Sequence, residues 1–566
     1  MCRVGEQMRV AECELPRSWR LRCRWVTWWR RWPRLNILAR SLALMTVPPA
    51  STNGDLRVDE VDNGYRPLSG WLAVALVTGT SAAVLVLEIL AGRILAPYVG
   101  VSLETFTGII GTILAGIAVG AWLGGVAADH VNPRRLLPLL LVLGGALAIA
   151  TIPIVRILGE GSGNGGGIRI LVLTAFGFLP SATVLSAVPP AVIKLQLRDI
   201  ASTGTTVGRL SAWSTAGALF GTFFTGFVLV SAAAVTTLIV AVGLVLIASG
   251  TAMWVATRTV SAGEMLGIGG LAAVSLVGAV GVDSPCETQT AYYCLSVLED
   301  PDLKSGRTLV LDDLRHSYVD LDDPTRLEFW YVRRIVDAIE AHATSPGVPL
   351  DAVYLGGGAF TVPRYVRATR PGSIQTILEI DGDLVDVVEE RLDFDRQDDV
   401  EIVVGDGRLA VDELDDDSAS LVVGDAFGSR AVPFHLATKE FLADVERVLR
   451  PTGIYVANII DGPAEKFLRA EVATVAEVFN HVAVIRGPGI VSGRNGNSVV
   501  IASQSPLNER SLAQRLGRDV RLGGATSDDP DRVVGEVLVG DDLAQYLDGA
   551  DILTDDFAPV DQLIGG

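Results

Sequence analysis

Residues 353–361 read VYLGGGAFT, an apolar run that breaks into three glycines. Such a run is typical of a buried strand, and glycines directly after a strand let the backbone approach a ligand closely. The stretch therefore predicts a strand that ends at a ligand site formed by Gly356, Gly357 and Gly358. The next residue, Ala359, has no polar group to offer such a ligand.

Strands and helices alternate on the carboxyl side of this stretch. The predicted strands are DAVYLGG, IQTILEID, VEIVVGD, ASLVVGDAF, GIYVANII and HVAVIRG, with helices near 361–370, 383–392, 407–412, 437–449 and 464–478. Alternation of this kind predicts a parallel, doubly wound α/β sheet, and such sheets bind ligands beyond the carboxyl ends of their strands. Before it, residues 290–320 predict a small antiparallel β unit, which an amphipathic helix follows.

Acidic residues stand at the ends of the next three strands. Glu379 and Asp381 end the second strand, Asp406 and Gly407 follow the third, and Asp425 follows the fourth. A carboxylate about 20 residues after a glycine run can accept hydrogen bonds from a ribose diol. The pattern is closer to S-adenosylmethionine sites than to the GxGxxG motif of nicotinamide sites. The alternatives are a solvated acid at 379 and helix caps at 406 and 425.

The segment 70–285 is apolar and contains only seven acids and nine Lys or Arg residues. A helix that spans a membrane needs about 20 mostly apolar residues. Seven stretches meet this requirement, near 71–92, 105–127, 136–156, 168–192, 210–230, 233–256 and 264–282. The sequence therefore predicts a polytopic α-helical membrane domain at 70–285, a β unit with its connecting helix at 286–345, and a Rossmann-like domain at 346–566.

Charge is distributed unevenly along the chain. The first 69 residues include a basic, Trp-rich leader, which we expect to be disordered or to lie on an anionic membrane face, unless translation begins at Met45. The net charge of −19 arises from the acidic residues after 285. An acidic domain argues against a nucleic-acid partner and favours small cationic ligands.

The Lys and Arg residues in the loops between the spans predict on which side of the membrane the C-terminal half lies. The basic N-terminus is predicted to be cytoplasmic, and so are the loops with Arg134, Arg135, Lys194, Arg198, Arg209 and Arg258. Seven crossings then leave the C-terminal half outside. An eighth crossing or a re-entrant last segment would place it inside. Outside, a disulfide between two cysteines eight residues apart in SPCETQTAYYCL is the natural interpretation, and inside they are thiols. No metal-ligand spacing is present, and we expect no metal.

Two charges lie at or near the end of the first predicted span. LEILAGRILAPYVG contains Glu88 and Arg93, and charges within a membrane are costly enough to suggest function. The alternative is an ion pair that fixes this helix to its neighbours. Close to the end of the second span, GAWLGGVAADH has small residues that permit close contact between helices.

Together these motifs resemble the spermidine synthases (polyamine aminopropyltransferases). The shared motifs are GRTLVLDDLRHS, LGGG, LEID, VGDGR, LVVGDAF and FLADVERVLRPTGIYV, in the family's order. Residues 70–566 resemble the membrane-bound version, in which a major-facilitator-like segment precedes the synthase domain. LEILAGRILAPYVG and ILTDDFAPVDQL are typical of that fusion.

The resemblance implies transfer of an aminopropyl group from decarboxylated S-adenosylmethionine, as co-substrate, to a polyamine or other small amine. Glu379 would then hold the ribose, Asp406 and Gly407 would lie by the adenine, and Asp425 would accept the proton of the attacking amine. The lipid bilayer is the other expected partner, and a homo-oligomer is left open.

The sequence departs from the family on the amine side. Where the family has an Asp after the glycine run, this chain has Ala359, and where the family has a His after the helix tyrosine, it has Val332. Gly428 replaces the family's second acid, and Tyr293 replaces a glutamine of the β unit. Recognition of putrescine is therefore expected to be altered. Two histidines, His316 and His435, are candidates for the altered acceptor pocket, or else polar residues satisfied in turns.

Two other functions stay open at this level. One keeps the nucleoside but changes the reaction, for example to methyl transfer. The other is a catalytically silent domain that binds polyamines or nucleosides beside a membrane transporter.

Overall fold

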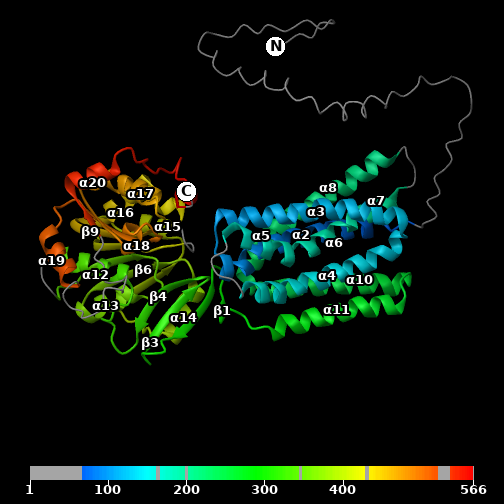
Figure 1. Cartoon of the computed structure of the whole chain (residues 1–566), viewed down its shortest axis with the longest axis horizontal. Coiled ribbons are helices and arrows are strands. Elements are labelled where there is room, and N and C mark those ends of the chain that lie inside the picture. Colours follow the sequence, from blue (N-terminus) through cyan, green and yellow to red (C-terminus); the bar gives the residue numbers. More distant parts are fainter. Residues whose placement is uncertain are drawn as a thin grey trace, which may run out of the picture. The chain divides into compact units, whose positions relative to one another are not determined.

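The computed structural model describes residues 67–160, 166–197, 202–342, 347–427, 432–519 and 536–564 (Figure 1). The predicted leader lies outside these residues except for 67–69, and so does Gly428.

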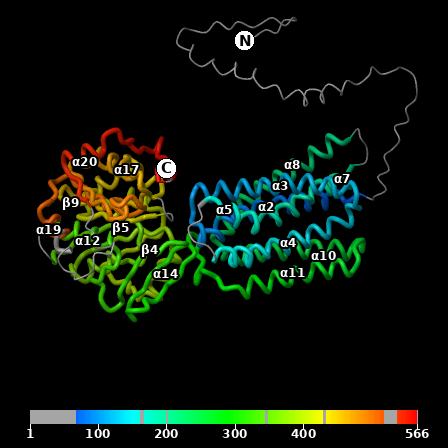
Figure 2. The backbone as a smooth tube through the Cα atoms, viewed as in Figure 1, coloured from blue at the N-terminus to red at the C-terminus, as the bar shows by residue number. Residues whose placement is uncertain are grey.

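The apolar half is built from long helices that run side by side (Figure 2). Six helices within the described residues are long and apolar enough to cross a membrane. They are α2 (Gly70–Val99), α3 (Leu103–His130), α4 (Pro133–Gly159), α8 (Thr203–Phe224) with its continuation through η4 (Thr225–Leu229) and α9 (Val230–Ala232), α10 (Val235–Thr257) and α11 (Ala262–Gly281). Each coincides with a predicted span.

The remaining candidate, near 168–192, is a broken helix. It consists of α5 (Gly166–Gly177), α6 (Leu179–Ser186) and α7 (Val188–Gln196), and the axis bends by 44° at the first break. Proline stands in the first turn of α6 and again of α7. Because proline removes a backbone donor and clashes with the preceding turn, it begins helices more readily than it continues them. Up to seven spans result if the bent pair is one span.

Small residues bring α3 and α6 together, as the GAWLGGVAADH motif predicts. A Cβ atom on Gly120 would lie 2.2 Å from the carbonyl oxygen of Thr183, and one on Gly124 would lie 2.5 Å from the Cα of Ala187. Only a glycine fits at such separations, and close backbone contact of this kind is how apolar helices associate in a bilayer.

Side-chain contacts show which helix ends lie together at each end of the bundle. At one end, Arg134 donates to the carbonyl oxygen of Pro67 at 3.2 Å and Arg135 pairs with Glu264 near the start of α11. At the other end, Arg156 of α4 donates to the carbonyl oxygens of Ala279 and Val282 at the close of α11. The start of α2 and the end of α11 are therefore at opposite ends of the bundle.

After α11 comes the small antiparallel sheet that the sequence predicts. Its strands are β1 (Thr288–Gln289), β2 (Cys294–Glu299), β3 (Gly306–Leu311) and β4 (Leu314–Asp320), in that spatial order. Helix α12 (Trp330–His342) follows.

The second sheet has eight strands in the order β12-β10-β11-β9-β8-β5-β6-β7. Its strands are β5 (Asp351–Leu355), β6 (Ile374–Glu379), β7 (Val400–Val404), β8 (Ala419–Gly424), β9 (Leu449–Asp461), β10 (His481–Arg486), β11 (Gly496–Ser503) and β12 (Glu536–Leu538). Strands β7, β6, β5, β8 and β9 are mutually parallel, which confirms the predicted α/β class. Strand β11 was not predicted, and it lies antiparallel between β9 and β10.

Helices cover both faces of this sheet (Figure 1). One core contains Tyr354 and Leu421 with residues of α12 and α13 (Thr361–Thr369), while the other contains Leu355 and Val422 with residues of α16 (Lys439–Val448) and α17 (Lys466–Ala476). Successive strand residues thus point to opposite cores, as expected of a sheet buried on both faces.

The close packing of α3 on α6 generates the first prediction. Gly120→Val should lower the thermal stability of the detergent-purified chain, by about 1–3 kcal/mol, because the added methyl groups meet backbone. Gly125→Val on the same helix is the matched control, since a Cβ there meets nothing within 4 Å. Equal melting temperatures for both variants would contradict the packing argument.

Candidate nucleoside-binding site

The ends of β5, β6, β7 and β8 open into one cavity of about 150 Å³. Nine of the predicted site residues line it: Tyr293, His316, Gly356, Gly358, Glu379, Asp406, Gly407, Asp425 and His435. The two others, Gly357 and Asp381, lie directly behind the lining and contact it through hydrogen bonds. Residues scattered over about 140 positions of sequence therefore meet at one edge of the sheet.

Each of the three glycines occupies a position where a side chain would be strained or would clash. Gly356 and Gly358 have φ angles of +85° and +53°, which favour glycine. A Cβ on Gly356 would lie 2.5 Å from the carbonyl oxygen of Asp425, and one on Gly357 would lie 2.3 Å from the ring of Phe360. The glycine run therefore brings the β5 turn into direct contact with the end of β8.

Glu379 is held by the same turn. Its carboxylate accepts hydrogen bonds from the backbone N–H of Gly357 at 2.8 Å and of Asp381 at 3.0 Å. Burial raises the pKa of this carboxyl group, and the backbone donors partly offset that rise because they favour the charged form. Asp381 itself caps helix α14 (Gly382–Arg391) and accepts a hydrogen bond from Thr290.

Asp406 and His435 form a pair across the cavity wall. The Oδ1 atom of Asp406 accepts from the backbone N–H groups of Arg408 and Leu409 at the start of α15 (Gly407–Asp412), and Oδ2 lies 3.0 Å from Nε2 of His435. The helix-cap alternative therefore holds for Asp406, which lines the cavity as well. Arg408 forms a bidentate ion pair with Asp555, so the C-terminal ILTDDFAPVDQL motif braces this wall.

Asp425 lies in a polar network that the sequence did not reveal. Asn458 donates to its Oδ1 at 2.8 Å, and Asn497 donates in turn to Asn458 at 2.9 Å. Tyr331 also donates to this carboxylate. Burial raises the pKa of Asp425 to about 6, while the donors from Asn458 and Tyr331 lower it. The group is thus mostly ionised at neutral pH and close to its titration range.

Two more predicted residues complete the wall next to Asp425. Burial lowers the pKa of His316 to about 4, so its ring is neutral at physiological pH. The backbone oxygen of His316 lies 3.2 Å from the hydroxyl oxygen of Tyr331. The hydroxyl of Tyr293 donates to the carbonyl oxygen of Phe427, two residues beyond Asp425, at 3.1 Å.

Two of the residues that differ from the spermidine synthase motifs, Ala359 and Val332, are buried in the core. Ala359 is 0% exposed and Val332 is 5% exposed, and both belong to the core between the sheet and its helices. Neither lines the cavity. Among the described residues that line it, the acids are Glu379, Asp406 and Asp425, and none is Lys or Arg.

Sequence reasoning missed Asn458 and Asn497 and gave no role to the hydroxyl of Tyr331. A signal existed for Asn458, since it is the one polar side chain in the apolar run GIYVANII after its tyrosine, and it is 3% exposed. Buried polar groups are normally hydrogen-bonded, so such a residue points to a polar partner. Over the described ranges, no group of three His, Cys, Asp or Glu residues could hold a metal ion.

Comparisons with known proteins agree with this geometry. No family model matches the chain. The chain is 26% identical over 234 residues to the polyamine aminopropyltransferase of Vibrio vulnificus (strain CMCP6), a match that covers 40% of this chain and 75% of that protein. It is 29% identical over 230 residues to a probable polyamine aminopropyl transferase of Bifidobacterium longum (strain NCC 2705), covering 38% of this chain and 48% of that one.

A solved structure is also similar. The probable spermidine synthase from Corynebacterium glutamicum ATCC 13032 has 26% sequence identity, covers 49% of this chain and 99% of its own, and gives a TM-score of 0.43.

The strand order and the acids at the strand ends define a doubly wound α/β domain with a candidate ligand site at the ends of its strands. The sequence relatives specify it further. The C-terminal half of the chain is a spermidine synthase-like domain, as its motifs predict.

Proposed function

We propose that the chain is a membrane-bound aminopropyltransferase that moves an aminopropyl group from decarboxylated S-adenosylmethionine to an amine. The convergence of Gly356, Glu379, Asp406 and Asp425 in one cavity carries this proposal. The names of the sequence relatives support it.

The aminopropyl donor, decarboxylated S-adenosylmethionine, fits the side of the cavity that Glu379 and Asp406 form. Two oxygens of a carboxylate offer about four acceptor positions, so Glu379 can bind a ribose diol as well as its two backbone donors. Asp406 and Gly407 form the wall for the base. A sulfonium is a cation, and the described lining offers carboxylates with no competing Lys or Arg.

Asp425 performs the proton transfer in this proposal. The amine nitrogen attacks the carbon next to the sulfonium, the carbon–sulfur bond breaks, and its electron pair leaves on sulfur as the neutral thioether of methylthioadenosine. The proton released by the new ammonium passes to the Asp425 carboxylate. Asn458 and Tyr331 orient that carboxylate through their hydrogen bonds.

The acceptor side supports an altered amine specificity. A diamine such as putrescine needs partners for two ammonium groups, and each charge-assisted hydrogen bond contributes roughly 1.5–3 kcal/mol. Ala359 and Val332 are buried, and near Asp425 the lining offers the rings of Tyr293 and His316. We therefore infer that putrescine is a poor acceptor.

Calorimetry of ligand binding to the full chain tests the proposed site for the adenosyl group. Wild type should bind methylthioadenosine, and Glu379→Ala should weaken binding by about 1–3 kcal/mol, because the hydrogen bonds of the ribose lose their partner. Glu401→Ala is the control, since this acid is exposed on the adjacent strand β7.

The ligand panel separates the functions. Affinity for S-adenosylmethionine but not for its decarboxylated form would indicate methyl transfer. Affinity for polyamines alone would indicate a silent binding domain, and no affinity for any adenosyl compound would refute the nucleoside site.

The Asp425 carboxyl group generates a pH prediction. It accepts a proton only when ionised, so kcat/KM should fall about tenfold per pH unit below pH 6, the pKa to which burial raises it. Asn458→Ala removes a donor that favours the ionised form and should move this acid limb to higher pH. Asp425→Asn should abolish transfer. A pH profile flat to pH 5, or an active Asp425→Asn variant, would contradict the assignment.

We further propose that the chain crosses the cell membrane several times and that residues 286–566 face the outside. Two observations support this: the basic loops share one end of the helix bundle with residue 67, and Cys286 is joined to Cys294 by a disulfide. Disulfides persist in oxidising compartments. An external site requires the adenosyl donor to be present on that side, whereas a cytoplasmic donor requires the opposite placement.

Cysteine labelling of intact cells decides the placement. With an impermeant maleimide, and with labelled peptides resolved by mass spectrometry, Cys286 and Cys294 should react only after prior reduction. A double Cys286→Ser, Cys294→Ser variant is the control for specificity. Labelling that appears only once the cells are lysed would place the domain in the cytoplasm.

A further inference from the structure

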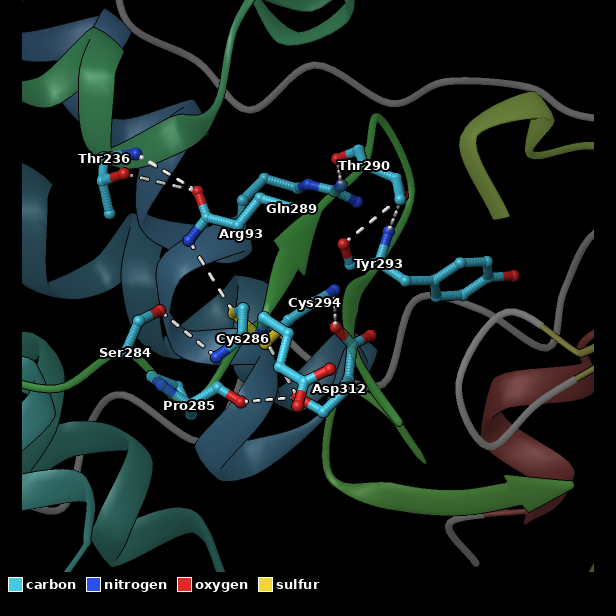
Figure 3. Close-up of a disulfide and its surroundings, with 12 residues drawn as sticks. Arg93, Thr236, Ser284, Pro285, Cys286, Gln289, Thr290, Tyr293, Cys294 and Asp312 are labelled. Carbon is cyan, nitrogen blue, oxygen red and sulfur yellow. Dashed lines mark hydrogen bonds between the residues drawn. A yellow bond between two sulfur atoms is a disulfide. The ribbon is translucent and has the colours of Figure 1, made fainter. Parts of the chain in front are cut away.

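Arg93 of helix α2 contacts the soluble domain (Figure 3). Its guanidinium donates to the carbonyl oxygen of Thr290 at 3.0 Å and to that of Tyr292. No ion pair of Arg93 or of Glu88 occurs within the described residues. The predicted ion pair of this helix is therefore replaced, for Arg93, by hydrogen bonds to backbone.

The turn that Arg93 contacts, residues 290–293, forms one wall of the cavity. Tyr292 and Tyr293 both line the cavity, and the hydroxyl of Tyr293 reaches the carbonyl oxygen of Phe427 beside Asp425. A shift of this turn therefore changes the distance between Tyr293 and the reacting groups.

Within the soluble domain the turn has its own restraints. The disulfide between Cys286 and Cys294 closes the hairpin that contains it (Figure 3). The side-chain oxygen of Thr290 accepts from the backbone N–H of Tyr292 and Tyr293 at 3.1 and 2.9 Å, and its hydroxyl donates to Asp381. Among the described residues outside this domain, Arg93 is the one side chain that donates hydrogen bonds to the turn.

A guanidinium suits this task. Its planar fork can bind two neighbouring carbonyl groups at once, and the geometry of both is then fixed relative to α2. A lysine ammonium at the same position is a point charge and can satisfy the two carbonyls only with looser geometry.

We propose that Arg93 is a positioning residue for the site: it holds the 290–293 turn so that Tyr292 and Tyr293 form the wall beside Asp425. The site is then complete only when helix α2 is present. The inference rests on the proposed function where it assigns a nucleoside and an amine to this cavity. The claim that Arg93 holds the 290–293 turn in place does not depend on that function.

The test uses the full chain in nanodiscs, with Arg93→Gln, Arg93→Lys and Arg135→Gln. The control Arg135→Gln removes a cation of the same helical region, at its other end. The rate of amide hydrogen exchange at residues 290–293 should rise about tenfold in Arg93→Gln and by less in Arg93→Lys. The rate should stay unchanged in Arg135→Gln. Methylthioadenosine affinity should fall about five- to tenfold in Arg93→Gln at an unchanged melting temperature.

A double-mutant cycle separates positioning from general stabilisation. Thr290→Val loosens the turn from within, so Arg93→Gln should add little to the exchange or affinity change in that background. Fully additive effects, or unchanged exchange at 290–293 in Arg93→Gln, would overturn the proposal. Wild-type protein without affinity for methylthioadenosine would refute the proposed function, and the exchange measurement would still decide the role of Arg93.

Discussion

The close contact between the β5 turn and the end of β8 is the constraint on which the site depends. Glycine is needed at 356 because the backbone is left-handed there and lies against Asp425. The same turn presents the N–H of Gly357 to Glu379, which ties the ends of β5 and β6 together. Three adjacent strand ends are therefore held together by the backbone contact at Gly356 and by the carboxylate of Glu379.

Each acid of the cavity is stabilised by a different kind of donor. Glu379 has backbone N–H groups, Asp406 has a helix start and His435, and Asp425 has side chains from β9 and α12. These differences bear on the tasks that we propose for Glu379 and Asp425. Burial raises the pKa of Glu379 as well as that of Asp425, and for Asp425 the raised value is about 6. A carboxyl group that titrates near neutral pH suits the proton transfer that we propose for Asp425.

The sequence predicted what depends on chain direction and missed what depends on tertiary packing. Acids at the ends of parallel strands must meet at one edge, so strand order alone was enough to group Glu379, Asp406 and Asp425. The partners of Asp425 could not be predicted, because Asn458 reaches it from another strand whose pairing no local pattern fixes. The antiparallel β11 was missed for the same reason. The proline in the first turn of α6 indicates the helix break at Phe178. We predicted one continuous span there because the whole segment is apolar.

The position of Arg93 links the apolar helices to a wall of the cavity. A guanidinium near the end of an apolar helix is costly unless its donors are satisfied, and the carbonyls of the 290–293 turn satisfy them. The turn in return gains an anchor outside its own domain. Ala359 and Val332 are buried outside the cavity, whereas Tyr292 and Tyr293 of this turn line it. The cavity wall that Tyr292 and Tyr293 form is thus the wall for which we propose a positioning role of α2.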